Sequence, residues 1–499
     1  MSQISISNLT FAYDGSYDNI FEGVSLTLDT DWRLGLVGRN GRGKTTLLSL
    51  LMGKYEYSGS ISASVDFEYF PYAVEDMSAQ AVDVAYSICP TLEYWELCRE
   101  ISRLELPDDR LFRPYNTLSF GERTKLMLAA MFLRENSFLL IDEPTNNLDA
   151  RGRKLTADYL QTKKGFILVS HDRSFLDGCV DHIMSINRAD IEVRKGDFSA
   201  WYADRMATDR RELEENKRLK KEIAALEQSA RQAAQWSERL EGTKKSTRIA
   251  GLRPDRGAIG AQAARMMKRS KNIEAHREAA AEEKAGLLHN IEKIDDLHIS
   301  PLAHHAKRLV WAEDLSISYG EGEIFSGVNL CIEQGQRVAL CGRNGSGKSS
   351  IFRAIEGSAG GEMPGNMRCG GRLQTASGLI LSVVSQDTSF LSGSLSDYAQ
   401  SCGVDESLFK AILRKLEFPR PVFERDMKTY SAGQKKKVLI ARSLCERAHL
   451  YLWDEPLNYI DIFSRMQIEE MLRQGGFTML FVEHDRAFCE NVATAEVRL

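Results

Sequence analysis

The chain of 499 residues is longer than one hydrophobic core usually supports, so two or three domains are expected. A hydrophobic content of 43%, a charged content of 27% and a net charge of −5 exclude a protein that coats nucleic acid over its whole surface. The nine cysteines contain no C-x-x-C pair, which favours free thiols over a disulfide or zinc framework. The N-terminus lacks the pattern of a signal peptide and no apolar run approaches the ~20 residues of a membrane span, so we expect a soluble, cytoplasmic protein.

Residues 1–203 have the pattern of a nucleotide-binding α/β domain. A glycine-rich loop at 38–45 follows an apolar strand and precedes a helix, and it matches G-x-x-x-x-G-K-[ST]. Its backbone N–H groups would converge on phosphate, Lys44 would neutralise the terminal phosphates, and the Thr45 hydroxyl would hold Mg²⁺. A later apolar strand ends in Asp142 and Glu143. We expect Asp142 in the Mg²⁺ shell and Glu143 to polarise the attacking water.

Residues 204–300 differ in composition and are rich in Ala, Glu, Lys and Arg. Apolar residues such as Leu219, Ile223 and Leu226 recur at helical spacing, whereas glycines and a proline interrupt the pattern between 242 and 260. This arrangement predicts two long helices folded back on each other across a tip loop, a helical hairpin.

Positive charge is concentrated at the tip of this predicted hairpin. Between Arg239 and Lys271 there are 10 basic residues against 2 acidic ones. Such a patch would bind phosphate backbones in a salt-dependent way. The alternative, a solvated and charge-rich coiled coil, fits the nearly neutral stems but not the tip. The candidate RNA-binding residues are Arg239, Lys244, Lys245, Arg248, Arg253, Arg256, Arg265, Lys268, Arg269 and Lys271.

Residues 301–499 repeat the first domain. Residues 19–46 align without gaps on 323–350, with 13 of 28 positions identical, and the second copy has its own loop at 342–349. Lys348 and Ser349 take the places of the first loop's lysine and threonine, and a second apolar strand ends in Asp454 and Glu455. We therefore expect an α/β fold with two tandem P-loop ATPase domains joined by the hairpin.

Further motifs resemble those of ABC ATPases in both copies. Residues 118–122 and 430–434 resemble the signature motif, while His171 and His484 resemble the switch histidine. Tyr13 and Tyr319 resemble the aromatic that stacks on adenine, although a core strand aromatic is the better interpretation of either tyrosine alone.

The resemblance implies that ATP is sandwiched between the two domains, with Lys44 facing Ser431 and Lys348 facing Ser119. It also places Gln386 near Mg²⁺. Two departures occur: Tyr72 stands where the first copy should carry that glutamine, and Tyr430 replaces the leucine that usually opens the second signature. We expect both sites to bind ATP and to hydrolyse it unequally.

The candidate residues of the two ATP sites fall into three classes. The catalytic candidates are Glu143, Glu455, His171 and His484. The candidate Mg²⁺ residues are Thr45, Asp142, Ser349, Gln386 and Asp454. The ATP-binding candidates are Tyr13, Gly38, Arg39, Asn40, Gly41, Arg42, Gly43, Lys44, Thr45, Thr46, Ser119, Gly121, Tyr319, Gly342, Arg343, Asn344, Gly345, Ser346, Gly347, Lys348, Ser349, Ser350, Ser431 and Gly433.

Two cassettes without a membrane span, joined by a helical hairpin, resemble the ABC-F proteins, which act on ribosomes. The run at 143–149 follows their Glu-Pro-Thr-Asn-His-Leu-Asp motif with Asn147 in place of histidine. Segments at 11–14, 38–43, 236–237, 257–260, 265–271 and 453–459 resemble more specifically the Lsa-type antibiotic-resistance proteins. This resemblance implies ribosome protection against lincosamides, streptogramin A compounds and pleuromutilins. It also implies that the hairpin reaches toward large-subunit ribosomal RNA and peptidyl-tRNA, and that the chain acts as a monomer whose two cassettes pair.

Three alternatives share the ATPase motifs. A housekeeping ABC-F translation factor need not protect against drugs. The ATPase subunit of a drug exporter would require a separate membrane protein, and a DNA-maintenance ATPase would have far longer coiled coils. The sequence does not decide the drug spectrum or the faster ATP site.

Overall fold

The computed structural model describes residues 2–15, 19–146, 148–187, 190–245, 261, 264–265, 268–269, 271–272, 275–276, 301–320, 322–343, 345–361 and 363–499. The chain divides into two compact units, one made of Met1–Ser199 with Ile294–Leu499 and the other of Ala200–Lys293. The first unit contains two α/β cassettes, and the predicted linker, 204–300, overlaps the second unit.

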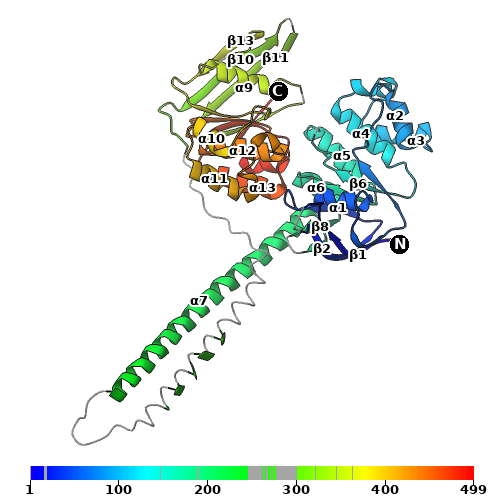
Figure 1. Cartoon of the computed structure of the whole chain (residues 1–499). Coiled ribbons are helices and arrows are strands. Elements are labelled where there is room, and N and C mark those ends of the chain that lie inside the picture. The colour runs from blue at the N-terminus through cyan, green and yellow to red at the C-terminus, as the bar shows by residue number, and fades with distance from the viewer. Residues whose placement is uncertain are drawn as a thin grey trace, which may run out of the picture. The chain divides into compact units, whose positions relative to one another are not determined.

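Each cassette combines a small antiparallel sheet with a larger, mostly parallel one (Figure 1). In the first cassette the antiparallel order is β2-β1-β4 and the larger sheet runs β5-β6-β7-β3-β8-β9. Its strands are β1 (Gln3–Phe11), β2 (Phe21–Asp29), β3 (Arg33–Val37), β4 (Ser58–Ser62), β5 (Asp66–Phe70), β6 (Ser137–Asp142), β7 (Phe166–Val169), β8 (His182–Ile186) and β9 (Ile191–Lys195).

The second cassette repeats this plan with the orders β11-β10-β13 and β14-β15-β16-β12-β17. The repeat predicted from the sequence is therefore present in the fold. Its strands are β10 (Arg308–Tyr319), β11 (Gly322–Glu333), β12 (Arg337–Cys341), β13 (Met367–Thr375), β14 (Leu381–Val384), β15 (Leu450–Asp454), β16 (Met479–Val482) and β17 (Ala495–Arg498).

The parallel strands are buried on both faces, which explains their continuous apolar sequences. Parallel pairing requires crossover connections, and helices supply most of them. In the first cassette these elements are α1 (Lys44–Leu51), α2 (Ala81–Ile88), α3 (Tyr94–Arg103), η1 (Asp108–Phe112), η2 (Tyr115–Thr117), α4 (Phe120–Met131), α5 (Ala150–Gln161) and α6 (Arg173–Cys179). In the second they are α9 (Lys348–Ser358), α10 (Leu395–Ser401), α11 (Glu406–Lys415), η3 (Arg420–Val422), η4 (Met427–Thr429), α12 (Ala432–Cys445), α13 (Ile462–Gln474) and α14 (Arg486–Val492).

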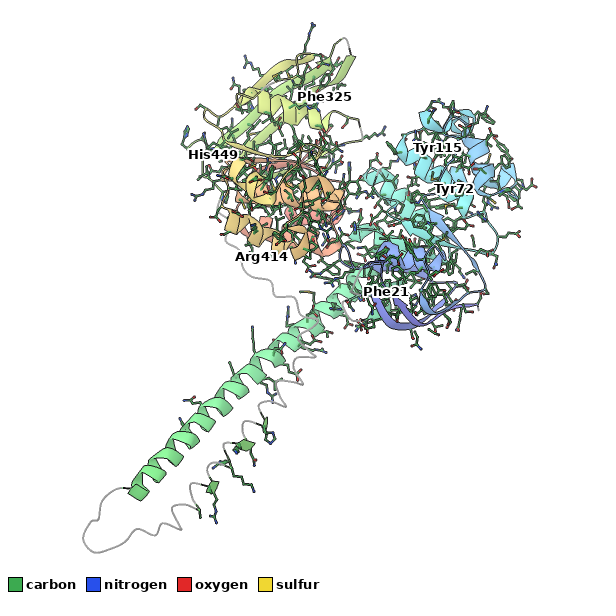
Figure 2. The ribbon with its side chains drawn as sticks, viewed as in Figure 1. Phe21, Tyr72, Tyr115, Phe325, Arg414 and His449 are labelled. Atoms are coloured by element: carbon green, nitrogen blue, oxygen red, sulfur yellow. The ribbon has the colours of Figure 1, made fainter. Side chains whose placement is uncertain are left out.

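The core of each cassette lies beneath its phosphate loop. Phe21 and Phe325 occupy equivalent places near the start of β2 and within β11 (Figure 2). A Cβ at Gly43 would lie 2.9 Å from the Phe21 ring, and one at Gly347 would lie 2.7 Å from the Phe325 ring. Because φ is also +91° and +92° at these two glycines, neither position accepts a side chain without strain.

In the second unit, α7 (Phe198–Lys245) is one helix of 48 residues (Figure 1). The described residues from 264 to 276 are also helical, but most of the predicted returning arm lies outside the described residues. The hairpin therefore stays a prediction. No helix in the described part of the chain is both long and apolar enough to cross a membrane.

Candidate active site

The phosphate loops end where α1 and α9 begin, so the free N–H groups of each first turn face the space above the loop. Lys44 Nζ donates to the carbonyl oxygens of Gly38 at 2.7 Å and Arg39 at 3.2 Å. Lys348 Nζ repeats this at Gly342 and Arg343, both at 2.9 Å. Burial lowers the pKa of both lysines. Both ammonium groups are thus held by carbonyl oxygens that phosphate oxygens would replace.

The candidate Mg²⁺ residues come together in each cassette. Thr45 Oγ1 donates to Asp142 Oδ2 at 3.3 Å, and the Ser349 hydroxyl hydrogen-bonds to Asp454 in the second copy. Burial raises the pKa of both aspartates. A hydroxyl and a carboxylate suit Mg²⁺, which usually takes one or two protein oxygens and completes its shell with phosphate and water.

The two glutamates follow these aspartates directly. Glu143 and Glu455 have φ of 51° and 45°, a left-handed conformation that non-glycine residues rarely adopt. The Glu143 N–H donates to Val169 at 2.9 Å and the Glu455 N–H to Val482 at 3.1 Å, which extends each sheet by one residue. Such strain is typical of functional sites.

The surroundings of Glu143 are unusual. Both of its carboxylate oxygens are buried and accept no side-chain hydrogen bond from the described residues, although the backbone N–H of His171 lies near enough to lower the pKa slightly. His171 Nε2 lies 3.3 Å from Oε1, but burial lowers the pKa of His171, so this ring is neutral. Burial, and next to it the charge of Asp142, raises the pKa of Glu143 to about 8. Burial therefore favours the protonated form of Glu143 near neutral pH.

Glu455 has different neighbours. Gln386 Nε2 and Asn458 Nδ2 each donate to Glu455 Oε2 at 2.8 Å. The neighbouring His484 ring, with Nε2 3.7 Å from Oε1, and the Asn458 amide lower the pKa of Glu455. Tyr72, at the place of Gln386 in the first copy, instead points toward α2, where its hydroxyl makes a long contact of 3.5 Å with Ser87 O. The second site thus holds an ionised, hydrogen-bonded base, and the first does not.

The signature motifs form the first turns of α4 and α12. Ser119 and Glu122 cap α4 reciprocally, at 3.2 and 2.8 Å, and Ser431 and Gln434 do the same for α12. Tyr430, the replacement for leucine, is buried, and its hydroxyl donates to Val422 O at 2.8 Å. Tyr430 therefore packs in the hydrophobic core of the second cassette.

Within the first unit, each signature lies near the opposite phosphate loop. Asn40 Nδ2 donates to Tyr459 O at 3.1 Å, and a Cβ at Gly433 would lie 3.5 Å from the same Asn40 nitrogen. On the other side, Ser119 and Lys348 line one cavity of about 990 Å³, a volume suited to a small ligand. Gly121, Arg343, Gly345, Gly347, Ser349, Ser350, Gln386, Glu455 and His484 also line it.

The remaining predicted residues are placed as follows. Tyr13 and Tyr319 lie beside the loops, with their hydroxyls 2.9 Å from Thr46 Oγ1 and 3.3 Å from Ser350 Oγ. The Arg39 guanidinium lies 5.5 Å from the Phe463 ring centroid, so its side chain contacts the second cassette. Arg265, Lys268, Arg269 and Lys271 are exposed, and Arg239, Lys244 and Lys245 belong to α7. Asn344, Arg248, Arg253 and Arg256 lie outside the described residues.

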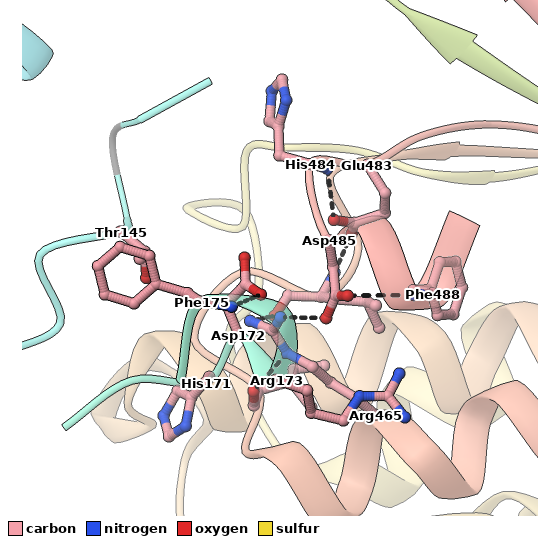
Figure 3. Close-up of polar contacts among 12 residues, drawn as sticks. Thr145, His171, Asp172, Arg173, Phe175, Arg465, Glu483, His484, Asp485 and Phe488 are labelled. Atoms are coloured by element: carbon pink, nitrogen blue, oxygen red, sulfur yellow. Dashed lines mark hydrogen bonds and ion pairs between the residues drawn. The ribbon is translucent and has the colours of Figure 1, made fainter. Parts of the chain in front are cut away.

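Sequence reasoning missed a buried network next to the sites (Figure 3). Arg153 donates to Asp172 and Arg465 to Asp485, both at 2.9 Å, and each aspartate also caps the following helix. The same pair occurs at equivalent positions of both cassettes, so a comparison of the two repeats could have found it.

A further ion pair joins the cassettes. Arg173 on α6 pairs with Glu469 on α13, and Asn491 Nδ2 donates to the other Glu469 oxygen at 3.2 Å. The equivalent arginine, Arg486, pairs with Glu490 on its own helix instead. No repeated motif marks the Arg173–Glu469 pair, which is why sequence reasoning did not find it.

The family model described as "ABC transporter" matches residues 21–146 and 325–458. The chain is 26% identical to the ribosome protection protein VmlR of Bacillus subtilis, with 99% of this chain and 86% of the relative covered. It is 27% identical to the ATP-binding protein Uup of Caulobacter vibrioides, with 96% of this chain and 74% of that relative covered. These relatives are of the ABC-F type, which confirms the resemblance found in the sequence.

Two solved structures show the same fold. The archaeal recycling factor aABCE1, in complex with the ribosomal stalk protein aP1, has a TM-score of 0.61 at 18% identity, with 97% of this chain and 86% of that chain covered. A structure titled RNase-L Inhibitor has a TM-score of 0.60 at 18% identity, with 98% of this chain and 86% of that chain covered. At this identity they establish only the arrangement of two cassettes in one chain.

Proposed function

This chain belongs to the ABC transporter family and is an ATPase, and we propose that it binds the ribosome and protects it from large-subunit antibiotics. The proposed drug classes are lincosamides, streptogramin A compounds and pleuromutilins. The observation that carries the proposal is the likeness over 99% of the chain to a protein named for ribosome protection. The exposed basic residues Arg265, Lys268, Arg269 and Lys271 support it, because ribosomal RNA presents phosphates.

The ATP cycle follows from the two sites. Lys44 and Lys348, with the helix starts beside them, would bind the phosphates. Thr45 with Asp142, and Ser349 with Asp454, would hold Mg²⁺, which would supply positive charge beside the phosphates. Ser431 and Ser119 would approach each nucleotide from the opposite cassette.

The hydrolytic step is assigned first to the second site. There Glu455 would accept a proton from the attacking water, while Gln386 and Asn458 fix the carboxylate through hydrogen bonds of 2.8 Å. His484 stands next to this carboxylate. In the first site burial favours the protonated glutamate and no side-chain donor of the described residues fixes it, so this site would hydrolyse ATP more slowly than the second.

The linker would convert this cycle into protection. Two bound ATP molecules would close the cassettes, and closure would set the angle of the predicted hairpin, 204–300. Its tip would then reach toward the peptidyl transferase region, near large-subunit RNA and peptidyl-tRNA. Closure favours the ribosome-bound state only by the difference in ribosome affinity between the open and closed forms. The chain would act in the cytoplasm as a monomer, since both halves of each ATP site come from one polypeptide.

Two measurements test the proposal. The first is sedimentation of the Glu143→Gln/Glu455→Gln chain with bacterial ribosomes and ATP, where we expect retention that the wild type loses as it hydrolyses ATP. The second is growth of a susceptible bacterium with one drug of each class, where we expect protection by the wild type only. Ribosome retention without protection would instead favour a housekeeping translation factor, and absence of retention would contradict the proposal.

A further inference from the structure

An aromatic hydroxyl occupies one oxygen of the first candidate Mg²⁺ carboxylate. Tyr69 OH donates a hydrogen bond of 2.9 Å to Asp142 Oδ2, the same oxygen that accepts from Thr45 at 3.3 Å. Two hydroxyl donors thus converge on one oxygen of this carboxylate. Neither the glycine-rich loop motif nor the acidic strand motif includes Tyr69.

The strand register shows that this contact has no counterpart in the second cassette. Tyr69 on β5 lies opposite Leu140 on β6, two residues before Asp142, so their side chains share one face of the sheet. In the second cassette Val383 on β14 lies opposite Leu452, again two residues before the aspartate, Asp454. Val383 is therefore the equivalent of Tyr69 and has no hydroxyl to donate.

The tyrosine is held in this orientation. Its ring packs against the core of the first cassette, and Lys54 Nζ lies 5.0 Å from the ring centroid. Its hydroxyl lies 2.9 Å from Asp142 Oδ2, within hydrogen-bond distance of the carboxylate. Tyr69 is thus placed to donate to this carboxylate.

We propose that Tyr69 is a positioning residue that weakens Mg²⁺ binding at the first nucleotide site by competing for Asp142. Mg²⁺ requires near-ideal octahedral coordination by oxygen atoms. It must therefore displace the tyrosine hydroxyl from Asp142 or bind a carboxylate whose negative charge that hydrogen bond already partly compensates. The second site has no such competitor, so the two sites would differ in metal affinity before any chemistry. This inference rests on the proposed role of Asp142, but not on the ribosome.

The test is a titration of Mn²⁺, as a probe for Mg²⁺, into the ATP-loaded Glu143→Gln/Glu455→Gln chain, with free Mn²⁺ read by electron paramagnetic resonance. We expect two affinity classes. Tyr69→Phe keeps the ring and should tighten the weaker class by roughly tenfold to hundredfold, the size expected for removing one hydrogen bond to a charged group. The reciprocal change, Val383→Tyr, should weaken the tighter class.

Controls separate this inference from the assignment on which it rests. Asp142→Asn should abolish the weaker class, and if it does not, Asp142 is not a Mg²⁺ ligand. Thermal unfolding of each variant shows whether it folds. Unchanged Mn²⁺ affinities in a folded Tyr69→Phe chain, with Asp142→Asn still losing a class, would overturn the role of Tyr69. Equal affinities of the two sites in the unsubstituted background would overturn it as well.

Discussion

The Gln386 amide donates a hydrogen bond of 2.8 Å to Glu455 and holds it as a fixed carboxylate in the second site. The first cassette has Tyr72 at this place, and the equivalent carboxylate, Glu143, accepts no side-chain hydrogen bond from the described residues. The duplicated cassettes thus carry the same motif residues in two chemical states. Most of the predictions below use one cassette as the control for the other.

We predict that the two sites contribute unequally to ATP hydrolysis. Glu455→Gln should lower steady-state ATPase activity by about 10²-fold or more, since it removes the ionised base. Glu143→Gln should lower the activity by less than about tenfold, because the Glu143 carboxyl is protonated near neutral pH. Measured turnover of each single variant decides the matter, and equal losses would contradict the assigned asymmetry.

Stability should depend on pH in opposite senses at the two glutamates. The folded-state pKa of Glu143 is raised to about 8. The protonated carboxyl therefore contributes fully to the free energy of unfolding below the ordinary pKa of glutamate, and this contribution is lost as the pH rises through 8. The stability of Glu143→Gln relative to wild type should therefore improve between about pH 5 and pH 8.

Glu455 is the matched control for that measurement. The pKa of Glu455 is lowered. Its carboxylate therefore contributes to the free energy of unfolding above the ordinary pKa of glutamate, and this contribution is lost only as the pH falls through the folded-state pKa. Glu455→Gln should be destabilised at neutral pH. Thermal unfolding without nucleotide at several pH values measures both trends, and a common trend in the two variants would refute the assigned states.

The Arg465–Asp485 pair should be important for stability. Arg465 is 5% exposed and Asp485 is 0% exposed, so Arg465→Ala leaves a buried carboxylate without its partner. We expect a loss of about 3–5 kcal/mol in the free energy of unfolding. Arg486→Ala is the control, because the Arg486–Glu490 pair lies on the surface. Denaturant unfolding that gives similar small losses for both variants would contradict the account.

The ion pair between Arg173 and Glu469 should couple the two cassettes. Arg173→Glu places two carboxylates together and should weaken ATP-dependent closure, whereas the double variant Arg173→Glu/Glu469→Arg should restore it. Closure can be followed by energy transfer between dyes on the two cassettes. If the double variant is as defective as the single ones, charge pairing is not what Arg173 supplies.

The basic linker residues should govern the salt dependence of ribosome binding. We expect the slope of log K for ribosome binding against log salt concentration to fall by about 3 in magnitude when glutamine replaces Arg265, Lys268, Arg269 and Lys271. Each lost phosphate contact accounts for about 0.7–0.9 of this slope. The control replaces four exposed basic residues of the α7 stem, Arg210, Arg211, Lys217 and Lys221. Equal slopes in the two variants would argue against a tip that contacts RNA.

Much of the fold could be predicted because its evidence is local or repeated. The phosphate loop at 38–45 and the apolar strand before Asp142 are contiguous segments, and their recurrence at a fixed spacing establishes the duplication. The contact of Tyr69 with Asp142 could not be predicted, because it depends on the register of β5 against β6. The unequal pKa values of Glu143 and Glu455 likewise depend on burial and on donors brought from distant segments.

The central claim is best tested by translation in a purified bacterial system inhibited by a lincosamide, with this protein and ATP added. We predict that the wild-type chain restores peptide synthesis while the Glu143→Gln/Glu455→Gln chain, held on the ribosome, does not. Failure of the wild type to restore synthesis, under conditions where it binds the ribosomes and hydrolyses ATP, would contradict the account.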